Sequence, residues 1–187
     1  MENHGVLIGQ RDTDYIGGTL PYEIVNPSGD WTAYLPDPEW QVTTKTDTMA
    51  CVSFSALNCI ETLIRFHTGK KVNFSDRFLA YMSGTTIHGN FLFKVADSIR
   101  KDGLVLQEEW ATTPDMDWAT YYAVPPIELK NKAKNFLNEW TINYEFIDFT
   151  KESLLKHLKQ SPIQVVIPGH AIMLFTTIEQ VYKYFDH

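Results

Sequence analysis

The sequence lacks the features that mark several large classes of protein. Its 187 residues include only two cysteines, Cys51 and Cys59, too few for a disulfide framework or a thiolate zinc site. It has no run of 18 apolar residues, so we expect no membrane-spanning helix. It also has no run of five or six like charges, and a net charge of −7 offers no basic surface for nucleic acid. We therefore expect no nucleic-acid or membrane partner, no metal and no other cofactor.

The first residues do not form a secretion signal, because Glu2 comes early and no apolar core segment follows it. We accordingly expect a cytoplasmic location. Apolar residues make up 44% of the chain and aromatic residues 13%, which is enough to bury a sizeable core. The sequence does not fix the oligomeric state.

The spacing of apolar residues predicts helices first and strands later. Residues 1–46 are rich in Gly, Pro, Asp and Thr, with short β-like pieces at 5–8 and 21–25. From Thr48 onward, apolar residues recur every three or four positions, which predicts a buried helix capped by Asp47 or Thr48 and ended by Gly69. Further helices are predicted at 75–84, 91–103, 127–140 and 151–160, a loop at 111–124, and strands at 142–149, 162–167, 170–178 and 180–186.

This order predicts an α+β fold with segregated lobes. We divide the chain into an irregular or β segment (1–46) that packs on the β lobe, a helical lobe (47–110) and a β-rich lobe (111–187). The three parts are expected to form one compact unit with a cleft between the lobes. The aromatic stretch at 110–122 is a candidate wall of that cleft, with a packed lid as the alternative.

Cysteine chemistry needs a thiolate and a base that makes it. Cys51 lies in the first turn of its predicted helix, where unpaired N–H groups and the helix dipole lower a thiol pKa. Cys59 lies two turns further along among apolar neighbours and is expected to be structural. Among the histidines, His170 stands out because it opens an apolar strand after Pro168-Gly169, which fits either a local hydrogen bond or a chemical role. His88 lies in a loop and stays possible, and the other four, including His4, are expected to be solvated.

Five segments, in this order, resemble those of the papain-like cysteine peptidases. The resemblance covers roughly residues 30–187, and no single motif carries it alone. The segments are DTMACVSFSALNCIE, which resembles the start of that family's central helix, then SDRFLAYMSG, GNFLFKVADSIRKDGLVLQEEW, ESLLKHLKQSPIQVVI and the histidine strand GHAIMLF.

The resemblance implies a papain-like fold with two lobes, a helical one that begins its central helix at the cysteine and a β-sheet or barrel that carries the histidine. It also implies that Cys51 is the nucleophile, that His170 is its partner across the cleft, and that Asp186 takes the place of the residue that orients the imidazole. Peptide bonds would be hydrolysed through an acyl-enzyme, with a peptide or protein as substrate. Since the chain ends one residue after Asp186, we expect it to be part of something longer.

The sequence departs from the family at three places around this site. The oxyanion-hole Gln should lie six residues before the nucleophile, where Lys45 stands instead, and Gln41 is the nearest Gln. The double glycine of the substrate loop is reduced to Gly89-Asn90, which could still present backbone to an extended peptide. Val52 replaces the usual Trp. These departures leave two alternatives open: a Cys–His amidase or transferase acting on cell-wall or isopeptide bonds, and a non-catalytic binding module.

Overall fold

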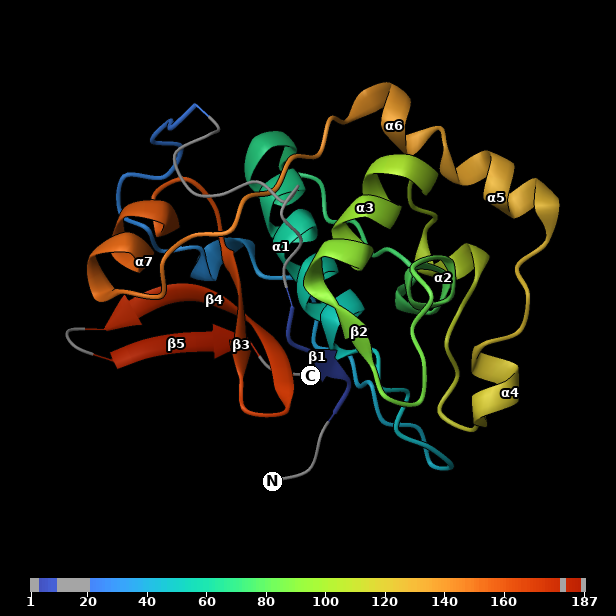
Figure 1. Ribbon diagram of the computed structural model, residues 1–187. Helices are drawn as coiled ribbons and strands as arrows, with labels where there is room; N and C mark the ends of the chain where they lie inside the picture. Colours follow the sequence, from blue (N-terminus) through green and yellow to red (C-terminus); the bar gives the residue numbers. More distant parts are fainter. Residues whose placement is uncertain (1–3, 10–20, 179–180, 186–187) are drawn as a thin grey trace.

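The computed structural model describes residues 4–9, 21–178 and 181–185. Its central element is helix α1 (Cys51–Thr68), which has helices on one side and a three-stranded sheet on the other (Figure 1). Gly69 ends α1 in the left-handed conformation and donates its N–H to the Arg65 carbonyl, as predicted. This arrangement of helices and sheet around one buried helix is the predicted α+β fold.

The predicted cap of α1 is wrong. Ala50 takes the N-cap position and provides no side-chain cap, whereas Asp47 accepts the Met49 N–H at 2.8 Å. Met49 has a φ of 57°, so a left-handed turn separates the Asp47 carboxylate from the first turn of the helix. Asp47 is therefore available for other contacts, which are described below.

The helical side of the molecule follows the prediction with two changes. Ser75 caps its helix through its side chain, and Gly103 ends the next one, as expected. The helix predicted at 127–140 is divided into two, and the loop predicted at 111–124 contains a short helix capped by Asp117. The elements are α2 (Asp76–Met82), α3 (Leu92–Asp102), α4 (Trp118–Tyr121), α5 (Ile127–Ala133), α6 (Phe136–Glu139) and the 3-10 turns Thr32–Tyr34 and Gln107–Glu109.

The sheet side contains the three predicted C-terminal strands, β3 (Ile163–Ile167), β4 (His170–Ile178) and β5 (Val181–Phe185). They pair antiparallel in the order β3-β4-β5, with Val165 opposite Ile172. Helix α7 (Lys151–Leu158) precedes them and is capped by Thr150, as predicted. The strand predicted at 142–149 is wrong: Phe146 forms a single bridge there, while Ile142 and Ile147 pack against different core clusters. Residues 21–25 are not a strand either.

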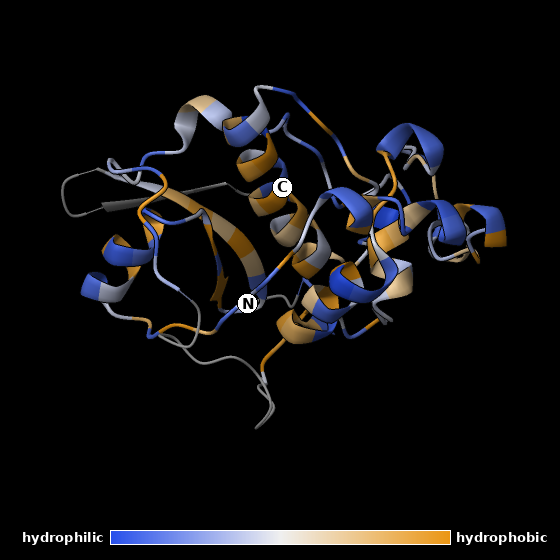
Figure 2. Cartoon of the chain, turned by 90° about the horizontal axis from the view of Figure 1, so that it is seen from above, coloured by the Kyte–Doolittle hydropathy of each residue, from blue (hydrophilic) through white to orange (hydrophobic). Residues whose placement is uncertain are grey.

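Helix α1 contributes to both main core clusters. One cluster joins its first residues to α3 and to Ala171 at the start of β4, and the other joins it to the sheet and to Trp31. Trp31 is fully buried and donates its indole N–H to the Leu158 carbonyl at 2.7 Å. Figure 2 shows apolar residues along the central helix and the sheet, and more polar residues on the outer helices. Within the described ranges, no helix is both long and apolar enough to cross a bilayer.

A second, two-stranded sheet joins the start of the chain to the helical side. Strand β1 (Val6–Leu7) pairs in parallel with β2 (Asn90–Phe91), so that Val6 lies opposite Asn90. In Figure 1 the two strands lie near the lower end of α1, between the large sheet and the helices. Val6 belongs to the same core cluster as Cys51, which places this strand next to the start of α1.

Candidate active site

Cys51 is the first residue of α1, and its side chain has no solvent-accessible surface. The start of a long helix favours a negative charge, because its N–H groups point outward along the dipole. Cys59 has a different environment, since it packs against the second core cluster and burial raises the pKa of its thiol to about 12. Of the two thiols, Cys51 is therefore the one placed for thiolate chemistry.

His170 is the first residue of β4, and its side chain is only 8% exposed. Gly169 precedes it with a φ of 80°, so the chain makes a tight turn between β3 and β4 immediately before the imidazole. Ala171 follows it in the core cluster that contains Cys51. The β-lobe histidine is thus held beside the cluster from which α1 begins.

Residues His4 and Gly5 connect the two halves of this site. The His4 N–H donates to the Gly169 carbonyl at 2.7 Å, and the His4 ring lies edge-on to the His170 ring with centroids 5.5 Å apart. Gly5 lies against Met49, two residues before Cys51, since a Cβ on Gly5 would come within 2.0 Å of the Met49 oxygen. His4 contacts the turn before His170, and Gly5 contacts the residues before α1. Because the Cα atoms of adjacent residues are only about 3.8 Å apart, this dipeptide spans the space between the His170 turn and the start of α1.

His4, expected to be solvated, has a side chain that is 40% exposed but also makes specific contacts. Its Nδ1 lies 2.9 Å from Asp47 Oδ2, and its carbonyl accepts a hydrogen bond from Gln41 Nε2 at 3.0 Å. Sequence reasoning missed both His4 and Asp47 because their contacts join residues about forty positions apart. The only local signal was the β-like piece GVLI that follows His4.

Gln41, the predicted oxyanion-hole residue, is 2% exposed and points into this site. Its amide nitrogen donates to the His4 carbonyl and, at 2.8 Å, to Asp47 Oδ1. An amide that donates to the carbonyl of a chain lying next to Cys51 has the chemistry that an oxyanion hole needs. Lys45 lies in a turn in which its backbone N–H donates to Thr43 Oγ1.

Gly89 and Asn90, the predicted substrate-binding pair, contact Gly5 on the side away from Met49. The Asn90 N–H donates to the Gly5 carbonyl at 2.7 Å, and a Cβ on Gly89 would come within 1.8 Å of that carbonyl oxygen. The Asn90 side chain is turned inward and donates to Ser83 and Thr85. Asn90 therefore offers its backbone to an extended chain and uses its side chain to hold the loop. His88, the other candidate base, is exposed on this loop.

Asp186, the predicted third member of the triad, lies outside the described residues. Among the described residues, no three His, Cys, Asp or Glu side chains are grouped to hold a metal ion. The segment at residues 4–7, which ends in β1, is surrounded by Cys51, His170, Gln41, Gly89 and Asn90. The arrangement fits attack by a thiolate on the carbonyl of an extended peptide.

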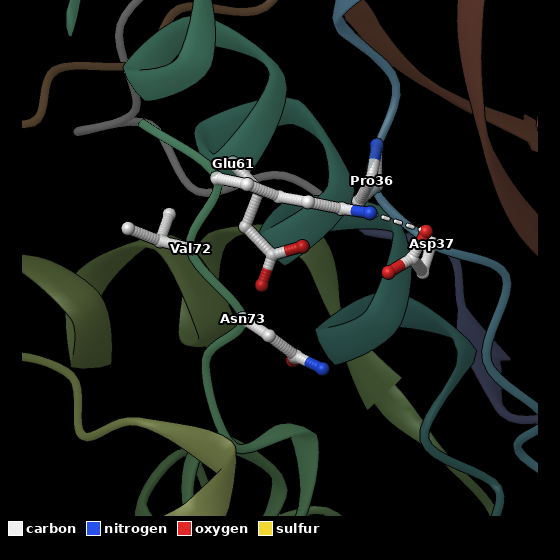
Figure 3. A pocket seen from close by; sticks show the side chains of 6 residues that line it. Pro36, Asp37, Glu61, Val72 and Asn73 are labelled. Carbon is white, nitrogen blue, oxygen red and sulfur yellow. Dashed lines mark ion pairs between the residues drawn. The ribbon is translucent and has the colours of Figure 1, made fainter. Parts of the chain in front are cut away.

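Two hollows adjoin the core. The first, about 490 Å³, is lined by the loop before Gly89 and by the aromatic stretch singled out from the sequence: Tyr81, Gly84, Thr85, Thr86, Ile87, Trp118 and Tyr122. The Tyr122 hydroxyl donates to the Thr48 carbonyl at 2.7 Å, which ties this hollow to the start of α1. The second, about 190 Å³, lies farther along α1 around Glu61 (Figure 3).

Comparison with known proteins supports the fold. No protein-family model and no curated protein sequence matches the chain. Xylellain, a cysteine protease from Xylella fastidiosa, superposes with a TM-score of 0.69 at 14% identity over 98% of this chain and 83% of its own. The fold is that of the papain-like cysteine proteases.

Other structures with this papain-like fold include digestive procathepsin L 3 of Tenebrio molitor and the ragweed pollen cysteine protease Amb a 11 in its proform. Their TM-scores are 0.61 and 0.55, at 14% and 16% identity over 97% and 83% of this chain. The chain spans only 64% and 53% of their respective lengths. At such identities the likeness shows the fold, and the chemistry depends on the residues described above.

Proposed function

We propose that this protein is a cysteine peptidase that hydrolyses peptide bonds in extended chains. The observation that carries the proposal is the course of residues 4–7, which end in β1. This segment passes between the His170 turn and the start of α1, and its His4 and Gly5 carbonyls accept hydrogen bonds from the Gln41 amide and the Asn90 N–H. A substrate peptide in its place would meet the same donors.

In the proposed reaction, the Cys51 thiolate adds to the substrate carbonyl carbon, and the oxygen takes the negative charge. The Gln41 amide and the Cys51 N–H would stabilise that oxygen. His170 holds the proton taken from the thiol and delivers it to the amine as the carbon–nitrogen bond breaks. Water then hydrolyses the thioester with His170 as base. Asp186 is proposed to orient the imidazole, and a cytoplasmic location remains part of this proposal.

Because Cys51 is fully buried and residues 4–7 lie against the start of α1, the proposal requires that this segment leave the cleft before a substrate enters. Each hydrogen bond of the segment contributes about 1 kcal/mol net and the buried Val6 side chain about 1.5–3 kcal/mol, while ordering costs about 1–2 kcal/mol per residue. These contributions nearly cancel. The described structure would then be a resting form, and the active form would have β1 displaced.

Alkylation of Cys51 by iodoacetamide, followed by peptide mass spectrometry, tests the proposal. The rate of labelling is compared among the wild type, Gly5→Ala and Gly84→Ala. In Gly5→Ala the added methyl meets the Met49 carbonyl, so β1 should be displaced. Gly84→Ala is the matched control, because Gly84 also has a positive φ but has open space around it. We expect Cys51 in Gly5→Ala to be labelled at least about tenfold faster than in the other two, with Cys59 unchanged.

Cleavage of an unfolded protein by the Gly5→Ala variant completes the test. We expect cleavage that is abolished by Cys51→Ser and by His170→Ala. Labelling without cleavage of any chain would refute the peptidase. Cleavage confined to branched or cell-wall peptides would favour the amidase instead.

The complete burial of Cys51 favours one alternative, a non-catalytic binding module. It predicts that Cys51 in Gly5→Ala reacts like an ordinary thiol, with labelling that rises only above about pH 8. The peptidase predicts rapid labelling that persists near pH 5 and is lost when His170→Ala is added.

A further inference from the structure

Residues 4–7 run through a passage that, at Gly5, has room for the backbone but not for a side chain. On one side, a Cβ on Gly5 would lie 2.0 Å from the Met49 oxygen and 2.4 Å from its carbonyl carbon. On the other side, a Cβ on Gly89 would lie 1.8 Å from the Gly5 oxygen. Such Cβ contacts are about 1 Å closer than real ones, so both the occupant and the wall must be glycine here.

The Met49 wall is main chain held in a fixed position. Met49 has a φ of 57°, and its N–H donates to Asp47 Oδ1 at 2.8 Å. The same oxygen accepts a hydrogen bond from the buried Gln41 amide, also at 2.8 Å. Asp47 and Gln41 lose their bonds to His4 when residues 4–7 leave, but the two bonds to Asp47 Oδ1 remain, so the Met49 carbonyl should keep its position.

The Gly89 wall is equally well supported. Gly89 and Thr86 exchange two backbone hydrogen bonds, of 2.8 and 3.1 Å. The Asn90 amide then ties the loop to Ser83 and Thr85 through bonds of 3.0–3.2 Å. A wall of hydrogen-bonded backbone cannot move aside as the end of a flexible side chain can.

We propose that the cleft selects glycine: a substrate that follows the edge of β2 must place a glycine between Met49 and Gly89. This inference rests on the proposed function for its substrate, but the selection itself concerns binding. The places on either side of the glycine differ from each other. The side chain at the place of Val6 is buried in the core cluster, and the one at the place of His4 is half-buried beside Asp47. The accepted peptide therefore has a glycine with an apolar neighbour.

A protection experiment tests the selection without requiring catalysis. The protein is Gly5→Ala, whose own strand is displaced, and the probe is the synthetic peptide HGVLIG, which copies residues 4–9. We expect this peptide to slow iodoacetamide labelling of Cys51. The peptide HAVLIG should protect at least about tenfold less at equal concentration, while HGVLAG, changed at the exposed place of Ile8, should protect as well as HGVLIG. Equal protection by HAVLIG and HGVLIG would overturn the proposal.

The other outcomes are also decisive. If Gly5→Ala leaves Cys51 as slowly labelled as in the wild type, the passage accommodates a methyl and the proposal is wrong. If protection is glycine-selective but no peptide is cleaved, the selection stands and the peptidase function fails. If peptides are cleaved, exchanging Gly for Ala at one position should lower kcat/KM at least about a hundredfold. Tolerance of Ala at every position would refute the selection and leave the peptidase intact.

Discussion

The carboxyl group of Glu61 gives the sharpest prediction about stability. It lies in the hollow of Figure 3, is 5% exposed, and accepts the Phe74 N–H at 2.7 Å. Burial raises its pKa to about 8, partly offset by that hydrogen bond, and Glu39 and Asp76 raise it further. We consider the substitution Glu61→Gln, which keeps the shape and an oxygen acceptor but cannot ionise.

The direction in which the free energy of unfolding changes with pH follows from proton binding to Glu61. Between the ordinary pKa of 4.5 and the folded value of about 8, the folded protein holds a proton on Glu61 that the unfolded chain has lost. The free energy of unfolding of the wild type therefore falls as pH rises through this window and levels off above it. One retained proton corresponds to about 1.4 kcal/mol per pH unit, so from pH 6 to pH 8 the loss is about 2–3 kcal/mol.

Urea unfolding followed by tryptophan fluorescence, at pH 5, 6, 7 and 8, measures this loss. The contributions of groups other than Glu61 are the same in both proteins and cancel in the difference between wild type and Glu61→Gln. We expect the difference to be small at pH 5, to grow by about 2–3 kcal/mol between pH 6 and pH 8, and to reach about 3–4 kcal/mol in favour of the variant at pH 8. Glu39, whose pKa burial raises to about 6, should contribute a similar but smaller slope at lower pH. Parallel pH profiles for the two proteins would show that Glu61 ionises freely in the folded state.

Two further predictions concern the hollow beside α4 and the start of α2. In the Gly5→Ala background, Trp118→Ala should lower kcat/KM roughly tenfold for peptides that place an aromatic side chain in the hollow, and little for peptides with alanine there. The exposed Phe149→Ala is the control, and equal effects on both peptides would rule out the hollow as a binding place. Ser75→Ala should lower the free energy of unfolding by about 1–3 kcal/mol, because the buried Ser75 hydroxyl caps α2 and donates to the Trp110 carbonyl at 2.6 Å. Urea unfolding measures this, and a change below about 0.5 kcal/mol would contradict it.

Much of the fold was predictable because its signals are local. The apolar spacing of α1 and the glycine after it, the capping residues Ser75 and Thr150, and the apolar strands at the C-terminus each depend on neighbours within one or two turns. The wrong predictions have a common cause. Residues 142–149 alternate like a strand, but the side chains at the two ends of that segment reach different core clusters, so tertiary packing overrides the pattern.

Local patterns were enough to place Cys51 at the start of a buried helix and His170 at the start of an apolar strand. The segment that lies between them could not be found in this way. Strand β1 is two residues long, too short to show any periodicity, and the contacts of His4 and Gly5 with Asp47, Asn90 and Gly169 join residues far apart in the chain. The requirement for glycine at position 5 arises from its φ of 112° and from the closeness of the Met49 backbone, which no local pattern of residues encodes.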